Sequence, residues 1–581
     1  MLRPRTRPSF RFIARRITLP RPVPGSKARG GVSMIIETDK GHVEGTIEEG
    51  IHVFKGIPYA APPVDDLRWQ PPQAVTEWRP DVLKADTFGL ACLQPVYEDS
   101  LDGSEPVGEQ SEDCLYLNVW TSGVDTSKPK PVMVWIHGGA FKIGASHITM
   151  FSGLPLARKG AVVVSFNYRL GNLGFFAHPG LEAETGEQGP VNFGLLDQIA
   201  ALEWVKRNIA AFGGDPNNVT IFGQSAGGVS VLALFASPLA TGLFHKGIAQ
   251  SPYAIPEHSR EKAIENGTLV ASALFKLGPD ATAAELRKVP AELFAANEME
   301  GPDGEPVPVG GLAPVPVVDG VVLKKKIRQA FKDGDQKVLP LIIGSTSNEA
   351  SVLAAFGMDP VAVLGRFVDA GGEDATAFLQ ELKSLYAKDP EVNPKELDNK
   401  RRFAPLLLRD MLFTMQARWI SDQHSKKSSS WRYYFSYVTE ADREEHRYGV
   451  AHGNEVVYTM GTGDIFVGSK DVFTDNDRAV SEKVVDYWYS FANTGTPSGS
   501  VAWPKNEYGL LNPKDHTLKL DDPITLEKGF RRARLDRFIM LYPTLEAVLS
   551  GEGAEEAEAT GTGEYPGVEP AQEPASPGDH S

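Results

Sequence analysis

The chain has 581 residues, of which 41% are hydrophobic and 23% charged, and it carries a formal net charge of −16. This mixture is typical of a large globular protein and excludes collagen-like, fibrous and wholly disordered chains. The sequence contains no run of about 18 apolar residues free of charge, and an acidic body repels nucleic-acid phosphates. We therefore expect neither a membrane span nor a nucleic-acid partner.

The two ends of the chain differ in charge from its middle. Residues 1–33 are rich in Arg and lack the apolar stretch of a secretory signal. Because Met34 opens a segment typical of a first strand, we expect residues 1–33 to be a basic, disordered extension; an Arg-rich organellar presequence or a basic arm is the alternative. Residues 549–581 are acidic and rich in Gly, Pro and Ala, which predicts a disordered tail. We expect residues 34–548 to form a single catalytic domain.

The expected compartment is the cytoplasm, since no export signal is recognisable. Asn218 and Asn266 open formal N-glycosylation triplets, so an exported or secretory protein is the alternative. No pattern in the sequence indicates an oligomeric state.

Cys92 and Cys114 are the only two cysteines of the chain. As a disulfide they would close a loop of about 20 residues and stabilise the protein by roughly 3 kcal/mol in an oxidising compartment. As free thiols they would be ordinary buried side chains. Both interpretations stay open.

Short apolar runs alternate with longer amphipathic stretches along the middle of the chain. In residues 193–212, Leu, Ile and Val recur at steps of three and four, which indicates a helix with one buried face. Residues 319–331 and 359–388 predict further helices, and the Gly/Pro-rich residues 301–316 predict a long loop. The predicted strands are residues 132–136, 161–166, 219–222, 246–250, 339–344 and 431–437. This alternation predicts an α/β fold with a large central, mostly parallel sheet flanked by helices.

The strand at residues 132–136 runs into His137-Gly-Gly-Ala140-Phe141. Small residues let backbone amides approach a substrate oxygen, and a turn of this type occurs in lipases and esterases. The predicted donors are the amides of Gly139 and Ala140, joined by that of Ala226. A plain glycine turn is the alternative.

The strand at residues 219–222 runs into Gly223-Gln-Ser225-Ala-Gly227 and then into a helical pattern. Two glycines let the chain turn sharply from strand to helix, which holds Ser225 on a strained bend with its hydroxyl exposed. The helix that follows directs free amides toward developing negative charge. In this context the motif predicts a nucleophilic serine.

An activated serine needs a base, and the base needs an acid that orients it. In hydrolases with a serine turn of this type, the acid precedes the base along the chain, and both follow the serine. Glu349 is the only acid in the loop after strand 339–344, and His452 lies in a glycine-bounded loop after strand 431–437. We predict that these two complete the triad. From spacing alone, a surface glutamate and a hydrogen-bonded loop histidine stay open.

Together these motifs resemble the type-B carboxylesterase/lipase family, the cholinesterase-like branch of the α/β-hydrolases with its bacterial p-nitrobenzyl-esterase-like members. The resemblance runs from about residue 35 to residue 542 and includes residues 54–60, 111–119, 192–197 and 212–228. It implies an α/β-hydrolase fold and a serine carboxylesterase that hydrolyses small-molecule esters without a metal or organic cofactor. By this resemblance Ser225 is the nucleophile, Glu349 the acid and His452 the base, and Gly139, Ala140 and Ala226 supply the oxyanion amides.

Two alternatives to ester hydrolysis accompany the resemblance. A carbamate or amide hydrolase would use the same triad. A non-catalytic cholinesterase-like binding protein is more distant, because here the triad is complete.

Two departures from the family pattern bear on the substrate. Most relatives have Glu where this chain has Gln224, so one negative charge near His452 is absent. Cys92 and Cys114 match the family's first bridge, but no Trp lies between them. A Trp there would resemble a cation–π platform for quaternary ammonium, so choline esters are not expected substrates. Pocket walls are expected from Phe141, Ser251, Phe356 and Met411, with plain core packing as the alternative for each.

Overall fold

The computed structural model describes residues 34–95, 106–186, 189–255, 257–295, 298–300, 306–308, 315–507 and 514–550. The N-terminal extension, nearly all of the acidic tail and most of the long loop at residues 301–316 lie outside the described residues. None of the described helices is long and apolar enough to cross a membrane.

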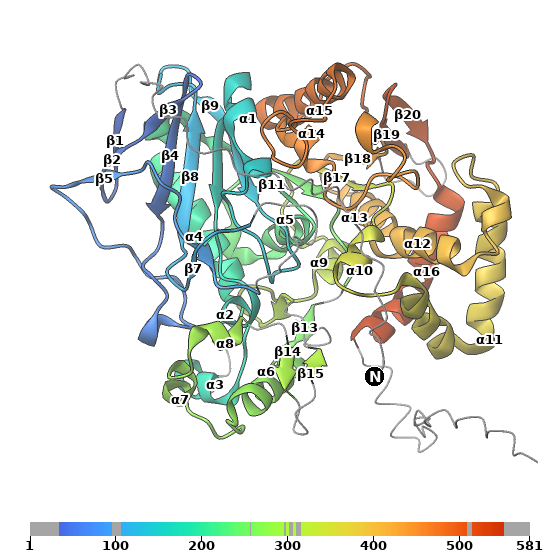
Figure 1. Ribbon diagram of the computed structural model, residues 1–581, viewed down its shortest axis with the longest axis horizontal. Coiled ribbons are helices and arrows are strands. Elements are labelled where there is room, and N and C mark those ends of the chain that lie inside the picture. The colour runs from blue at the N-terminus through green and yellow to red at the C-terminus, as the bar shows by residue number, and fades with distance from the viewer. Residues whose placement is uncertain are drawn as a thin grey trace, which may run out of the picture.

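An eleven-stranded sheet runs through the centre of the molecule (Figure 1). In spatial order its strands are β20 (Thr525–Lys528), β19 (His516–Leu520), β18 (Ser430–Phe435), β17 (Leu341–Thr346), β12 (Lys246–Gln250), β11 (Gly214–Gln224), β9 (Lys130–Ile136), β10 (Val162–Phe166), β8 (Tyr116–Thr121), β4 (Ile51–Pro58) and β3 (Thr46–Glu48). The strands from β19 to β10 pair in parallel, and β20, β8, β4 and β3 add antiparallel edges. The predicted large, mostly parallel sheet is confirmed.

Successive side chains of the central strands lie in two different cores, because side chains alternate across a sheet. In β9, Val132, Val134 and Ile136 belong to one core, whereas Met133 and Trp135 belong to the other. The helices over the first core are α4 (Phe193–Asn208), α5 (Ala226–Ala236), α9 (Ile327–Asp333) and α13 (Met415–His424). Those over the second core are α1 (Leu154–Lys159), α14 (Val456–Met460) and α15 (Asp475–Thr494). Both faces are therefore covered.

A third group of helices lies beside the sheet, at the right of Figure 1, around a core of its own. It includes α11 (Pro360–Tyr386), α12 (Lys400–Arg409) and α16 (Arg532–Ser550). The π-helical turn Asp410–Thr414 joins α12 to α13. Helix α11 confirms the helix predicted at residues 359–388. Helix α16 continues to Ser550, two residues into the predicted tail.

Smaller elements complete the described chain. Short sheets are formed by β1 (Ile35–Thr38), β2 (Gly41–Glu44) and β5 (Val82–Lys84); by β6 (Ala91–Cys92) and β7 (Gln110–Ser111); by β13 (His258–Ser259) and β16 (Val317–Val318); and by β14 (Glu298–Glu300) and β15 (Pro306–Pro308). The remaining α-helices are α2 (Gly171–Gly174), α3 (Pro179–Thr185), α6 (Arg260–Phe275), α7 (Ala283–Arg287), α8 (Ala291–Phe294) and α10 (Ser351–Ala355).

The helix predicted at residues 319–331 is wrong in its first half. The Oδ1 atom of Asp319 accepts hydrogen bonds from the N–H groups of Val321, Val322 and Leu323, at 3.0, 2.8 and 3.1 Å. Bonds of this kind offer the backbone an alternative to the helix. Helix α9 therefore begins only at Ile327.

Cys92 and Cys114 are free, buried thiols of the first core, so the disulfide alternative is not what the structure contains. The N–H of Leu170 donates to Sγ of Cys92 at 3.3 Å. A hydrogen bond with Cys92, together with burial, raises the pKa of Cys114. Both sulfur atoms are thus buried groups of the core that take part in hydrogen bonds.

Candidate active site

Ser225 lies on the bend between β11 and α5, with φ 58° and ψ −123°. A positive φ is strained for any residue with a side chain. The bend is held by the Ser225 N–H, which donates to the carbonyl of Gln250 at 2.9 Å. It also needs glycines, because a Cβ on Gly223 or Gly227 would lie 2.5 or 2.0 Å from the carbonyl oxygen of Ile136. The close approach of β9 to this bend explains the spacing of the motif.

The loop after β9 turns its backbone in the same left-handed region, with φ 103° at Gly139 and 53° at Ala140. The Gly139 carbonyl points back into the loop, where it accepts the N–H groups of Lys142 and Ile143 at 2.9 and 3.0 Å. Because the C=O and N–H of a trans peptide point in opposite directions, the Ala140 N–H points away from the loop. Gly139 and Ala140 line a cavity together with Ser225.

Side chains from neighbouring segments hold this loop in place. Gln94 accepts from the N–H of Gly144 at 2.7 Å and donates to its carbonyl at 2.9 Å. The His137 ring stacks on Tyr168 with ring centroids 4.4 Å apart, and the Tyr168 hydroxyl donates to the His137 carbonyl at 2.8 Å. Burial lowers the pKa of His137 to about 4, so this imidazole is neutral near pH 7. These contacts fix the geometry of the loop.

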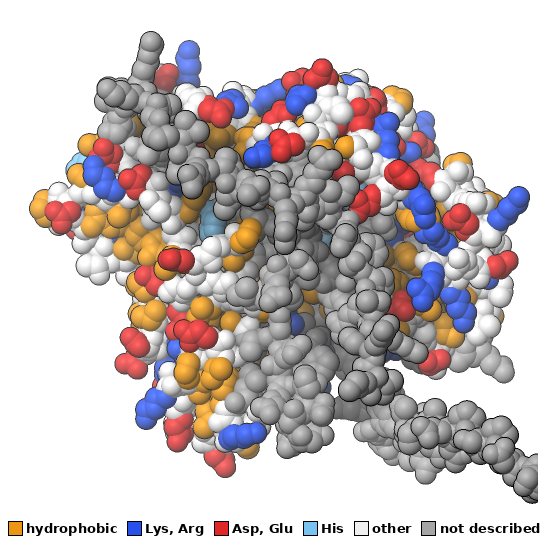
Figure 2. All heavy atoms as spheres, viewed as in Figure 1, with side chains coloured by type: hydrophobic (Ala, Val, Ile, Leu, Met, Phe, Trp, Pro, Cys, Tyr) orange, Lys and Arg blue, Asp and Glu red, His pale blue; other side chains and the backbone are white. Residues whose placement is uncertain are grey.

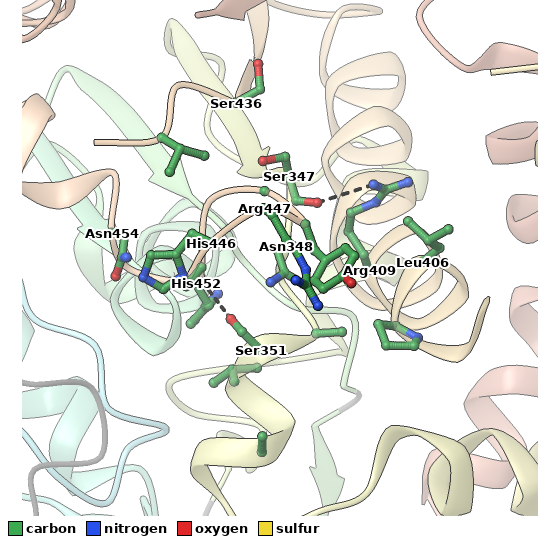
Figure 3. Close-up of a pocket in the computed structure, with 18 of the residues that line it drawn as sticks. Ser347, Asn348, Ser351, Leu406, Arg409, Ser436, His446, Arg447, His452 and Asn454 are labelled. Atoms are coloured by element: carbon green, nitrogen blue, oxygen red, sulfur yellow. Dashed lines mark hydrogen bonds between the residues drawn. The ribbon is translucent and has the colours of Figure 1, made fainter. Parts of the chain in front are cut away.

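Glu349 and His452, 103 residues apart in sequence, meet through a hydrogen bond between Oε2 and Nδ1. Glu349 is fully buried, and its Oε1 accepts the N–H of Thr346 at 2.6 Å. The His452 N–H donates to Oγ of Ser351 at 2.9 Å (Figure 3). A carboxylate at Nδ1 favours the tautomer with the proton on that atom. Nε2 is then left as the proton acceptor.

The loops that carry these two residues are bound to each other. The Asn348 N–H donates to the Val450 carbonyl at 2.9 Å, and the Val450 N–H donates to Oγ of Ser347 at 2.8 Å. Arg409 reaches from α12 to the Ser347 carbonyl at 3.3 Å (Figure 3). These contacts join the loop after β17 to the segment that leads to His452, and they thereby keep Glu349 beside the imidazole.

A cavity of about 2110 Å³ is lined by Ser225, Gln224, Gly139, Ala140 and His452. It exceeds the ~300–1,000 Å³ typical of ligand pockets. Glu349 and Ala226 do not line the cavity, because both are fully buried; Glu349 is hydrogen-bonded to His452, and Ala226 is the first residue of α5.

The expected pocket walls are only partly correct. Phe356 lines the cavity. Phe141, Ser251 and Met411 do not, because each is buried, with the two apolar side chains packed in the first and third cores. For these three residues the alternative expectation, burial inside the protein, is correct.

Gln224 lies where its sequence position predicted, with Nε2 3.1 Å from Nε2 of His452. The sequence analysis did not identify two further residues close to His452 and Glu349. The Phe413 ring, presented by the π-helical turn, lies 5.1 Å from the His452 ring, centroid to centroid. Burial and the negative charge of Glu349 raise the pKa of the fully buried Glu455 to about 7. The apolar residues that follow Glu455 were its only sequence signal.

Known proteins that are similar to this chain in sequence or in structure are esterases. Residues 32–537 match the model of the carboxylesterase family. The chain is 36% identical over 499 residues to the para-nitrobenzyl esterase of Bacillus subtilis (strain 168), covering 85% of this chain and 96% of that protein. It is 32% identical over 486 residues to the fumonisin B1 esterase of Sphingopyxis macrogoltabida, covering 82% and 85%. A solved structure of PNB esterase superposes with a TM-score of 0.69 at 31% identity, covering 86% of this chain and 99% of that one.

Proposed function

The chain belongs to the carboxylesterase family, and from this premise we propose that Ser225, His452 and Glu349 are its catalytic nucleophile, base and acid. The protein is a carboxylic ester hydrolase that acts on small-molecule esters. The assignment of the triad rests on one observation above all. The Glu349 carboxylate holds the His452 imidazole by Nδ1 in a cavity that Ser225 also lines.

In the proposed reaction, Nε2 of His452 takes the proton of the Ser225 hydroxyl as Oγ attacks the ester carbonyl. The imidazolium that forms is stabilised by the buried Glu349 carboxylate. It then gives its proton to the departing alcohol, which leaves an acyl-enzyme on Ser225. Water, activated by the same imidazole, hydrolyses the acyl-enzyme and restores the free hydroxyl.

The tetrahedral intermediate carries negative charge on the former carbonyl oxygen. We assign its hydrogen-bond donors to the amides of Gly139, Ala140 and Ala226. The positive φ angles at Gly139 and Ala140 and the start of α5 at Ala226 support this role. Donors fixed in advance do not reorganise during the reaction, and one such donor typically contributes ~3–4 kcal/mol.

The test is hydrolysis of p-nitrophenyl esters from acetate to palmitate by the wild type, by Ser225→Ala and by Ser384→Ala, which changes an exposed serine on α11. We expect Ser225→Ala to lose at least ~10⁴-fold in kcat and Ser384→Ala to match the wild type. Equal rates for Ser225→Ala and the wild type would contradict the assignment. A parallel series of p-nitroanilides and p-nitrophenyl carbamates compares amide and carbamate turnover by the same residues.

The compartment and the exclusion of nucleic acid are proposals of the same kind. Two free thiols are typical of a reducing compartment, which supports a cytoplasmic protein. The net charge of −16 opposes binding to nucleic acid. Cell fractionation and a gel-shift assay test the two proposals.

A further inference from the structure

Three arginines on the wall of the active-site cavity make no ion pair with a described acidic residue. Arg409, Arg443 and Arg531 line the cavity in ion pairs with Asp410, Glu440 and Asp389. By contrast, Arg401, Arg402 and Arg447 line the same cavity and make no ion pair with any described residue. Three cations of the cavity wall are therefore without an ion pair among the described residues, although acidic side chains line the same wall.

Two of these unpaired cations share one aromatic ring. The guanidinium carbon of Arg402 lies 3.5 Å from the ring centroid of Tyr448, and that of Arg447 lies 4.8 Å from it. The two cations are thus no further apart than about one Debye length at physiological ionic strength, ~8 Å. Each guanidinium is stabilised by the electron-rich face of the Tyr448 ring, but the two positive charges repel each other. An anion placed beside both would relieve that repulsion.

The elements that carry these cations face each other across the cavity. Arg402 lies near the N-terminus of α12, which begins Lys400-Arg401-Arg402. Arg447 lies on the loop that leads to His452, and Figure 3 shows that loop opposite Leu406 and Arg409 of α12. Lys and Arg side chains gather at the right of Figure 2, where Figure 1 places α12. An anion held here would lie in the same cavity as the His452 imidazole.

Other parts of the cavity wall suit the rest of such a molecule. Phe356, Met358 and Leu406 give it apolar surface. The volume of about 2110 Å³ leaves room for a chain several carbons longer than a simple acetate or butyrate. Acidic side chains also line the cavity: Asp359, Glu391, Glu396, Glu440, Glu444, Glu445, Asp521 and Asp522. None of them forms an ion pair with Arg402 or Arg447, and Glu440, Glu391, Asp521 and Asp522 are paired with other cations.

We infer that Arg402, Arg447 and Tyr448 form a subsite for the carboxylate of an anionic ester, so that the enzyme prefers esters with a carboxylate remote from the scissile bond. This inference rests on the proposed function and names its substrate class. Exposed ion pairs are weak, so the expected preference is modest. Removing either arginine should lower kcat/KM for an anionic ester about threefold, and removing both about tenfold.

The experiment compares matched neutral and anionic esters in two arms. In the first arm, mono-p-nitrophenyl esters of dicarboxylic acids from adipate to sebacate are compared with p-nitrophenyl alkanoates of the same carbon number. In the second arm, butyrates of ω-hydroxy acids are compared with butyrates of the matching alkanols, with acid release followed by titration. The enzymes are the wild type, Arg402→Gln, Arg447→Gln and the double variant. Arg443→Gln is the matched control, since it removes a cation from the same cavity that is already paired.

The subsite is supported if, in either arm, Arg402→Gln and Arg447→Gln lose activity toward the anionic ester but change less than about twofold toward the neutral ester. Arg443→Gln should keep the wild-type ratio of kcat/KM for the anionic ester to kcat/KM for the neutral ester. High salt should abolish the wild-type preference, because exposed charges are screened. Equal losses on neutral and anionic esters in both arms, or a ratio that no arginine variant changes, would overturn it. If instead the neutral esters are hydrolysed no differently by Ser225→Ala, the proposed function itself fails, which is a separate result.

Discussion

The side-chain nitrogen of Gln224 lies 3.1 Å from Nε2 of His452. This is the ring atom that takes the serine proton in the proposed reaction. Gln224 is nearly buried and neutral at every pH, so it affects the imidazole by hydrogen bonding and not by charge. A carboxylate at the same place would stabilise the imidazolium directly.

Gln224→Glu tests this difference. A negative charge next to His452 should raise the pKa of the imidazole by about one unit or more. The base acts only when neutral, so the acid limb of kcat/KM moves to higher pH and activity on that limb falls about tenfold. The pH profile of kcat/KM measures the shift. Gln224→Met, similar in size but uncharged, is the control, and an equal shift in both variants would contradict the charge effect.

Glu455 predicts a pH dependence of stability. Its pKa is raised from 4.5 to about 7 by burial and by the Glu349 charge, so between these values the folded protein keeps a proton that the unfolded chain has lost. The free energy of unfolding therefore falls as pH rises through this window, by ~3 kcal/mol in total. Glu455→Gln cannot ionise and should not show this fall.

Urea unfolding of the wild type and Glu455→Gln at several pH values checks this expectation. The difference in unfolding free energy between variant and wild type should grow from below pH 4.5 to above pH 7. Glu482→Gln, which changes an exposed glutamate of α15, should run parallel to the wild type. A constant offset for Glu455→Gln across the range would show that Glu455 is not protonated in the folded protein.

Gly223 predicts a steric requirement of the serine bend. A Cβ there would lie 2.5 Å from the Ile136 carbonyl and 2.7 Å from the backbone of Gly227. Backbone atoms on both sides cannot shift without strain. Gly223→Ala should therefore lower the free energy of unfolding by ~1–3 kcal/mol or more and displace Ser225. We expect a loss of esterase activity together with a lower midpoint of thermal unfolding.

Gly365 is the matched control for that substitution. A Cβ on Gly365, in α11, meets nothing within 4 Å. Gly365→Ala should therefore keep full activity and gain up to ~1 kcal/mol from helix propensity. Full activity in Gly223→Ala would show that the bend tolerates a side chain.

The state of Cys92 and Cys114 is directly measurable. Both are buried free thiols, so alkylation of the folded protein should be slow. After unfolding without a reductant, mass spectrometry should find both cysteines alkylated. Alkylation that requires prior reduction would indicate the disulfide that the family resemblance implies.

Much of the fold follows from local sequence. In β9 and β10, apolar runs between polar segments mark buried strands, and this signal does not depend on which strands lie beside them. Residues 319–331 show where local reasoning fails. Their apolar pattern predicted a helix, but the side chain of Asp319 captures the backbone of the next turn, a competition that periodicity does not register.

For the site, the candidates can be read from local sequence: the order of Ser225, Glu349 and His452 along the chain, and the glycines that each turn requires. Those follow from residue type and from the short-range geometry of a bend. The assembled fold, in contrast, determines that Glu455 is buried close enough to Glu349 for its pKa to rise to about 7, that the Phe413 ring packs beside the His452 imidazole, and that Arg402 and Arg447 share one ring. Desolvation, ring contacts and the repulsion of like charges depend on distances between segments far apart in the chain, and those distances exist only once the sheet and its covering helices have assembled.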